Sequence, residues 1–381
     1  MTTDKGCNCG QGLSRRRLLQ AGLAAAAVGA MSGSTDALAQ SQSQGMRAMS
    51  GAGVRPVDIH AHYFPEAYFK IFNEDGKRFG AEYRMTDQGF YYKMENRTSG
   101  PMATKWIDLK QRLADMDRQG VAVQALSLTS PMVYWGDEEL DHKLATAWND
   151  GASAAHQAYP TRFVGLCTLP MLYPDRAIDE LNRASKLPGI RGVYMGANVN
   201  NRDLDDPLFE PIWARIADLN LPVFLHPQQM DPLGGDRLRQ SYLSNLLGNP
   251  FDTTIAACHL IFGGVLDRHP KLEISLAHGG GAFPILIGRI DHGWEVRPET
   301  RHLPKAPSTY LRRFTYDTIV HSKAIMEFVI NQVGADRVMI GSDYCADMGY
   351  ERPLQFLEQI NLTSEQRNMI LGATATKLLK L

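Results

Sequence analysis

Several motifs that would point directly to a function are missing from this sequence. Its 40 lysines and arginines are balanced by 41 aspartates and glutamates, so no overall basic excess is available for binding nucleic acid. Five cysteines among 381 residues are too few to build a disulfide scaffold. Neither a P-loop nor a G-x-S-x-G elbow is present, and no G-x-G-x-x-G follows the first apolar run. These absences argue against nucleic-acid binding, dinucleotide binding and nucleophilic-serine chemistry.

The first forty residues have the composition of a targeting signal. The basic segment Ser14-Arg15-Arg16-Arg17 precedes an alanine-rich apolar run from Leu23 to Met31, and Ala37-Leu38-Ala39 follows as a small-residue cleavage site. Paired arginines at this place are typical of twin-arginine export. The apolar run is shorter than the roughly 20 residues that cross a bilayer as a helix. We therefore expect a cleaved signal peptide over residues 1–39, a periplasmic or secreted mature chain, and no membrane anchor after cleavage.

The remainder of the chain divides into a short leader and a long folded body. Residues 40–55 are rich in Ser, Gly, Gln and Ala without periodicity, which predicts a flexible leader. From residue 56 onward, eight short apolar runs alternate with longer segments of helical spacing, and this alternation implies parallel strands joined by right-handed crossovers. The pattern predicts a (β/α)₈ barrel over residues 56–381, with an open doubly wound sheet as the alternative. The expected strands are Val57–His60, Val121–Leu126, Phe163–Leu166, Ile190–Tyr194, Leu221–His226, Leu272–Leu276, Thr315–Val320 and Val338–Gly341, and the expected helices include 109–119, 140–158, 177–186, 208–219 and 253–268.

One segment, from about residue 65 to residue 106, interrupts the alternation. It is rich in aromatic residues, among them Phe69, Phe72 and Tyr83, and shows no helix or strand period. An insertion after the first strand of a barrel lies over the C-terminal mouth, so we expect a lid or a small hairpin. The alternative is a surface excursion without a functional role.

Five polar side chains close predicted strands: His60, His62, His226, His278 and Asp343. His60 and His62 are two residues apart in a strand, so their side chains point to the same side. All five lie at the face where barrel enzymes build their sites, and polar groups there are poor core material. Imidazoles with one carboxylate are ligands for a borderline divalent metal, so we expect one ion, with Zn²⁺ favoured and Mn²⁺ as the alternative.

Three longer segments of the sequence are similar to those of a known family. They are Met116-Asp117-Arg118-Gln119-Gly120-Val121-Ala122-Val123-Gln124-Ala125-Leu126-Ser127, Arg162-Phe163-Val164-Gly165-Leu166, and Ala277-His278-Gly279-Gly280-Gly281-Ala282-Phe283-Pro284. Together with the strand-end residues, they resemble the amidohydrolase superfamily, and within it the α-amino-β-carboxymuconate-ε-semialdehyde decarboxylases and their hydroxybenzoate decarboxylase relatives. The resemblance runs from about Val57 to the C-terminus.

The resemblance implies a role for each site residue. His60, His62, His226 and Asp343 match the positions that bind one zinc in that family. His278 matches the histidine that acts as acid or base beside the metal-bound water, with Asp343 contributing to catalysis. Arg289 matches an arginine that reaches the substrate carboxylate of the neighbouring subunit, which implies a homodimer.

The sequence departs from the family at the substrate side of the site. Gln228 stands where the family has a tryptophan, and Tyr344-Cys345-Ala346 stands where the family has the tripeptide Tyr-Pro-Phe. A second substrate-binding cation is expected from the insertion, with Arg84, Lys93 and Arg97 as candidates. We therefore expect a decarboxylase of a small unsaturated or aromatic carboxylic acid. A hydrolase or hydratase of an amide, lactone or carbon–carbon bond is the alternative, and a barrel that binds without catalysis is a third.

Overall fold

The computed structural model describes residues 53–94, 97–227 and 233–381, which fall within one compact unit, Met49–Leu381. The expected signal peptide, most of the leader and Gln228 lie outside the described residues. Among the helices of the described ranges, none is both long and apolar enough to span a membrane.

Eight parallel strands form the centre of this unit, in the order β1-β5-β6-β7-β8-β9-β10-β11. The sheet closes on itself, because Ala61 of β1 pairs with Tyr344 after β11 and the Ile59 N–H donates to the Ile340 carbonyl at 2.9 Å. The predicted barrel is therefore confirmed. The strands are β1 (Val57–His62), β5 (Val123–Ser127), β6 (Phe163–Cys167), β7 (Ile190–Gly196), β8 (Val223–His226), β9 (Ile274–Leu276), β10 (Phe314–Asp317) and β11 (Val338–Met339).

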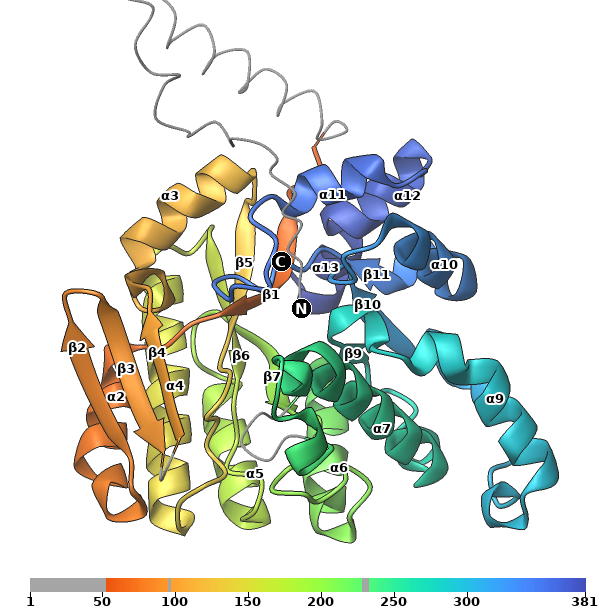
Figure 1. Cartoon of the computed structure of the whole chain (residues 1–381), viewed down its shortest axis with the longest axis horizontal. Coiled ribbons are helices and arrows are strands. Elements are labelled where there is room, and N and C mark those ends of the chain that lie inside the picture. Colours follow the sequence, from red (N-terminus) through yellow and green to blue (C-terminus); the bar gives the residue numbers. More distant parts are fainter. Residues whose placement is uncertain (1–52, 95–96, 228–232) are drawn as a thin grey trace, which may run out of the picture. The chain divides into compact units, whose positions relative to one another are not determined.

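Helices surround the strands, as Figure 1 shows. The expected helix over residues 253–268 is wrong as one piece, because α7 ends at Phe262 and a separate turn, α8, begins at Val265. Gly264, at φ +71, takes the left-handed conformation that favours glycine and so breaks the helix there. The helices after the insertion are α3 (Leu109–Gln119), α4 (Glu138–Ala158), α5 (Pro174–Ala184), α6 (Glu210–Leu219), α7 (Asn249–Phe262), α8 (Val265–Arg268), α9 (Phe283–Val296), α10 (Lys323–Val333), α11 (Pro353–Gln359), α12 (Ser364–Asn368) and α13 (Thr374–Leu379).

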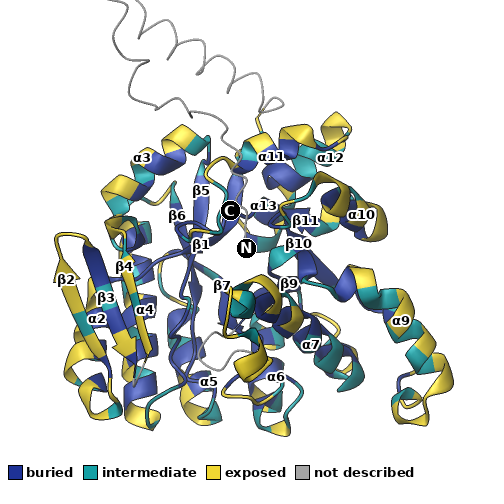
Figure 2. Cartoon of the chain, in the orientation of Figure 1, coloured by how far each residue is buried: buried dark blue, intermediate teal, exposed yellow. Residues whose placement is uncertain are grey.

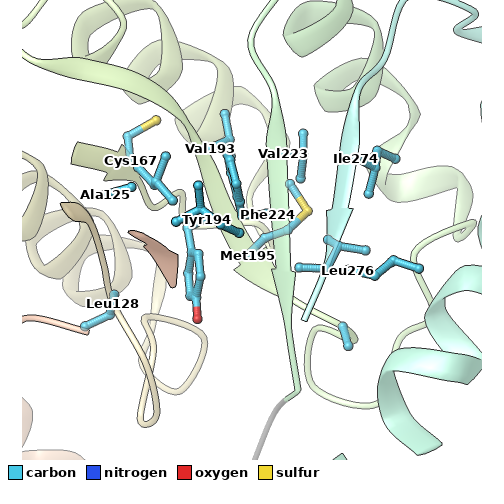
Figure 3. Close-up of a cluster of buried hydrophobic side chains, with 14 of the residues drawn as sticks. Ala125, Leu128, Cys167, Val193, Tyr194, Met195, Val223, Phe224, Ile274 and Leu276 are labelled. Carbon is cyan, nitrogen blue, oxygen red and sulfur yellow. The ribbon is translucent and has the colours of Figure 1, made fainter. Parts of the chain in front are cut away.

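The barrel strands are buried at every residue except the half-buried Arg191 of β7, and Figure 2 shows them as the dark centre of the fold. Aliphatic side chains such as Val193, Val223 and Ile274 fill the space around neighbouring strands, as Figure 3 shows. Strands covered on both sides read as continuous apolar runs, which is why the sequence pattern identified all eight. A rigid, close-packed barrel of this kind fixes the positions of the side chains at its strand ends.

The insertion is more regular than its sequence suggests. It begins with a helix, α2 (Glu66–Glu74), and continues as an antiparallel sheet of β2 (Glu82–Thr86), β3 (Gly89–Met94) and β4 (Arg97–Met102). The aromatic residues pack against one another and join the main core, with the rings of Phe69 and Tyr83 stacked at 4.3 Å. The sequence of this segment shows no helix or strand period, because packing among aromatic side chains stabilises elements too short to show one. Whether the insertion closes as a lid stays a prediction.

Candidate active site

The five strand-end residues meet at the C-terminal end of the barrel. His60 and His62 lie in β1, His226 ends β8, and His278 and Asp343 follow β9 and β11. One ligand atom from each of His60, His62, His226 and Asp343 lies within 4.8 Å of the others, and all four residues are buried. His278 lies next to this group, with its Nε2 3.8 Å from Asp343 Oδ2. The sequence-based expectation that these residues converge is confirmed by their positions.

The four-residue cluster fits a divalent metal ion. The Nε2 atoms of His60 and His62 face each other at 3.3 Å, and His62 Nε2 lies 3.1 Å from Asp343 Oδ1. His60 Nε2 lies 3.5 Å from Asp343 Oδ1. Ligands that share one ion through bonds of about 2.0–2.2 Å are roughly 3–3.6 Å apart, so these three separations are close enough for one ion. The donor set, imidazole nitrogens with one carboxylate, also suits such an ion.

For three of the four residues the electrostatics favour the forms that bind a metal. At His60, burial would lower the pKa, but the hydrogen bond to Asp317 and the charges of nearby carboxylates outweigh burial and raise that pKa. Burial lowers the pKa of His62 to about 4 and holds the pKa of His226 well below its ordinary value, so both imidazoles are neutral at physiological pH. Burial would raise the pKa of Asp343, but hydrogen bonds from His278 and His62 outweigh it and hold that pKa well below the usual range. Neutral imidazoles and an ionised carboxylate are the protonation states that metal ligands require.

Asp317, the last residue of β10, is a site residue that the sequence analysis missed. Its Oδ2 accepts a hydrogen bond from His60 Nδ1 at 2.8 Å and from the His278 backbone N–H at 2.9 Å. Its Oδ1 accepts the Gly279 N–H at 2.9 Å. A carboxylate on the far nitrogen of a ligating histidine fixes the ring's orientation and tautomer. Asp317 therefore positions a metal ligand and the backbone of His278 together. The signal that could have identified it is a carboxylate inside an otherwise apolar strand.

A buried polar network supports the cluster from below. Asp58 accepts hydrogen bonds from the Ser342 hydroxyl at 2.6 Å, the Ser342 N–H at 3.0 Å and Gln124 Nε2 at 3.0 Å. The fully buried Arg112 donates to Gln124 Oε1 at 3.1 Å and to the His62 carbonyl. This network ties β1 to the segment that carries Asp343, so the ligands on both are held in register.

Two site residues have a strained backbone. His278 has φ 54 and Asp343 has φ 56, the left-handed region that costs a side-chain-bearing residue about 1–3 kcal/mol. Such strain persists only where surrounding contacts over-determine it. For His278 these contacts include the bonds that its own N–H and the Gly279 N–H donate to Asp317. A Cβ on Gly279 would lie 2.2 Å from Val320 Cγ1, so this turn requires glycine.

A cavity of about 570 Å³ opens above the cluster. The insertion contributes one wall, through Tyr92 and residues 99–103, 105 and 106, so this segment lines the site as its position after the first strand predicts. The Trp106 ring lies parallel to that of His62, with centroids 6.0 Å apart. Other lining residues come from the barrel loops: Thr129, Ser130, Tyr242, Asn245, Asn249, Cys345, Ala346 and Asp347.

Lys105 is the one lysine or arginine among the described residues that line this cavity. Arg84, Lys93 and Arg97, the candidates from the sequence, are on β2, β3 and β4 and do not line it; the Arg84 guanidinium lies over the ring of Tyr91 instead. Lys105 was not predicted as a site residue, because it follows the last strand of the insertion in a stretch without periodicity. Arg289 lies exposed on α9 and is not among the residues lining the cavity of its own chain.

Comparisons with known proteins agree with this geometry. The sequence pattern of a family described as amidohydrolase matches residues 57–381. The chain is 38% identical to a 2-amino-3-carboxymuconate-6-semialdehyde decarboxylase from Dictyostelium discoideum over 274 residues, which cover 71% of this chain and 76% of the relative.

Solved structures share the fold. A 5-carboxyvanillate decarboxylase from Sphingomonas paucimobilis superposes with a TM-score of 0.73 at 27% identity, over 86% of this chain and all of that one (100%). A dihydroxybenzoic acid decarboxylase from Polaromonas sp. JS666, solved with bound manganese and the inhibitor 2-nitroresorcinol, superposes with a TM-score of 0.71 at 23% identity, over 86% of this chain and 97% of that one. The chain belongs to the amidohydrolase family, in its group of metal-dependent decarboxylases.

Proposed function

We propose that this protein removes CO₂ from a small aromatic or unsaturated carboxylic acid bound in the 570 Å³ cavity. One observation carries the proposal: the histidine beside the metal cluster, His278, and the cationic Lys105 line the same cavity. A decarboxylase needs a cation for the anionic substrate and a proton donor for the carbon that loses CO₂. The hydrolase alternative has no comparable observation in its favour.

His60, His62, His226 and Asp343 would hold the metal ion. When bound, the ion supplies a concentrated positive charge that polarises coordinated oxygen and lowers the pKa of water. Lys105 Nζ holds an anionic oxygen of the substrate by a charge-assisted hydrogen bond. Trp106 and Tyr92 provide flat apolar walls that orient a ring or a conjugated chain. The bound acid is thereby placed against His278.

His278 delivers the proton. Its Nε2 faces Asp343 Oδ2, and the turn after β9 fixes its backbone through Asp317. A proton moves from the imidazolium Nε2 to the carbon that bears the carboxylate. The carbon–carbon bond to the carboxylate then breaks, its electron pair returns to the conjugated system of the substrate, and CO₂ leaves. His278 regains its proton from solvent, so one proton is consumed for each CO₂ released.

The metal is proposed to be zinc, because three imidazoles with one carboxylate are a donor set that suits it well. Manganese is the alternative and is the ion in the Polaromonas structure. Elemental analysis of protein purified without added metal distinguishes the two, and activity of metal-free protein reloaded with each ion identifies the one that supports turnover.

The active protein is proposed to be a homodimer in which Arg289 of each subunit reaches the substrate of the other. Its exposed position on α9 leaves it available to a partner. Several large apolar side chains are also exposed near the cavity mouth and on α9, including Tyr242, Leu246, Phe251 and Ile285. Apolar surface of this kind is characteristic of protein interfaces. Sedimentation of the purified protein tests the dimer.

The mature protein is further proposed to be exported through the twin-arginine signal of residues 1–39. Fractionation of expressing cells tests this: full-length protein should appear in the periplasm or medium, and replacing Arg15, Arg16 and Arg17 by lysine should retain it inside.

The main experiment is a CO₂-release assay on metal-loaded protein with 2,6-dihydroxybenzoate, other hydroxybenzoates and unsaturated dicarboxylic acids. Release of CO₂ with one proton consumed supports the proposed reaction. Metal-loaded protein that hydrolyses esters or amides and releases no CO₂ from any acid would support the hydrolase alternative instead.

A further inference from the structure

A second chamber adjoins the main cavity on the other side of His278. It has a volume of about 240 Å³ and shares Asn245, Asn249, His278 and Asp343 with the main cavity. Both spaces border the proposed acid–base residue, His278, and the metal-cluster residue Asp343. A substituent of a substrate bound beside His278 therefore lies next to the second chamber.

The chamber differs from the main cavity in its chemistry. Apart from His321, its unshared side chains are apolar: Leu246, Pro250, Ile319, Val320, Ile325 and Met348, with Gly281 adding backbone. The main cavity adds Lys105, Ser99, Thr129, Ser130 and Asp347 to its aromatic walls. The end of a substrate near Lys105 therefore meets polar and charged groups, whereas the second chamber offers mainly apolar side chains beyond the residues that the two spaces share.

The chamber walls come from residues next to the catalytic turns. Ile319 is 3% exposed and follows Asp317, whose Oδ1 accepts the Ile319 N–H at 3.0 Å. Ile325, at the start of α10, and Leu246 are 36% and 44% exposed and stand at the open side. Asp317, which positions His60, therefore also holds the buried wall of the chamber in place. The open side is formed by exposed side chains.

The size of the chamber excludes a simple role in receiving CO₂. A water molecule occupies about 30 Å³ in the liquid, and CO₂ has only three heavy atoms. A space of about 240 Å³ is several times larger than that product needs. It can take an alkyl chain of several carbons or a second ring.

We propose that the substrate carries an apolar substituent that occupies this chamber, so that the enzyme selects alkyl- or aryl-substituted acids over their unsubstituted parents. The inference rests on the proposed function, because it describes the substrate of the same site. Each methylene that enters the chamber leaves water, which favours the bound state about fourfold. A propyl group would thus raise kcat/KM by roughly 50-fold.

The test compares 2,6-dihydroxybenzoate with homologues that carry a methyl, propyl or pentyl group, either opposite the carboxylate or next to a hydroxyl. For the intact enzyme, kcat/KM should rise with chain length in one of the two series. Ile325→Trp places a large ring at the open side of the chamber and should abolish the rise, with little effect on the parent acid. Phe328→Trp is the matched control, because Phe328 is also on α10 and 36% exposed but does not line the chamber. It should leave the rise unchanged.

Calorimetry separates this inference from the proposed reaction. Metal-loaded protein is titrated with 2-nitroresorcinol and with homologues alkylated at the equivalent carbons, none of which has a carboxylate to lose. Tighter binding of the homologues, lost in Ile325→Trp, supports the chamber even when no acid releases CO₂. Homologues that bind no better than the parent in the intact protein, or a gain that survives Ile325→Trp, would overturn it.

Discussion

Asp317 Oδ2 lies 2.8 Å from His60 Nδ1, and this contact links two functions of the site. The same oxygen accepts the His278 N–H at 2.9 Å, so one buried carboxylate orients a histidine of the metal cluster and the backbone of His278. The position of His278 relative to the metal cluster therefore depends on Asp317, which lies outside that cluster.

Replacing this carboxylate should weaken the metal site. Asp317→Asn keeps the shape of the side chain but removes its charge, and changes of this kind cost about 10–100-fold in metal affinity. We expect the metal ion to leave the variant at a chelator concentration that leaves the native protein loaded. Asp206→Asn, which alters a half-buried cap of a 3₁₀ turn, is the control. Equal metal retention in both variants would contradict the assigned role of Asp317.

Replacing His278 should affect metal content differently from replacing one of the proposed metal ligands. His226 belongs to the four-residue cluster, whereas His278 lies beside it, with its Nε2 3.8 Å from Asp343 Oδ2. His226→Ala should therefore lose both metal and turnover, whereas His278→Ala should retain about one ion per chain and lose most turnover. Elemental analysis alongside the CO₂ assay measures both properties. Equal loss of metal from the two variants would make His278 a ligand.

Much of this site could be predicted from the sequence, because strand ends in a barrel converge by topology. His60, His62, His226, His278 and Asp343 are polar residues at the ends of apolar runs, and the fold brings them together. Such residues need no tertiary information beyond the order of the strands.

Asp317 and Lys105 were not predictable in the same way. The expected strand ran from Thr315 to Val320, which placed Asp317 inside it, whereas β10 ends at Asp317 and residues 318–320 form a loop. Lys105 belongs to an insertion whose path is set by packing among aromatic rings. The place where such a segment crosses the cavity depends on contacts between residues far apart in sequence, which no local pattern records.

Lys105 should govern the binding of anionic substrates. Lys105→Met removes the charge while keeping most of the side chain's length, and loss of a hydrogen bond to a charged group costs about 1.5–3 kcal/mol. We expect kcat/KM for 2,6-dihydroxybenzoate to fall by about 10–150-fold, and Lys105→Arg to recover part of it. Lys93→Met, on β3 and outside the cavity lining, is the matched control. A similar loss in both methionine variants would show that the charge of Lys105 has no special role.

Asp141, in the first turn of α4, should make stability depend on pH. Burial raises its pKa from the ordinary value of 3.8 to about 7, although its Oδ1 accepts the Gly136 N–H at 2.8 Å. Because the folded-state pKa is raised, its favourable contribution is complete below pH 3.8 and is lost as the pH rises through 7. The loss is as much as about 4 kcal/mol.

Denaturant unfolding at pH 5 and pH 8 tests this dependence. Asp141→Asn cannot ionise, so the part of the fall in unfolding free energy that is due to Asp141 should be absent from the variant. Asp150→Asn, an exposed position on the same helix, should keep the native pH dependence. If the unfolding free energy of Asp141→Asn fell between pH 5 and pH 8 by as much as that of the native protein, Asp141 would be ionised in the folded protein at pH 5.

Subunit mixing should reveal whether Arg289 acts across a dimer. His278→Ala and Arg289→Ala homodimers should each be nearly inactive on carboxylate substrates. In a mixed dimer, the subunit with Arg289→Ala keeps its own His278 and receives an intact Arg289 from its partner, so one of its two sites is complete. Random reassociation of equal amounts makes half of the dimers mixed, and activity should return to about a quarter of the native value. If Arg289 served its own subunit, neither site of the mixed dimer would be complete, and mixing would restore nothing.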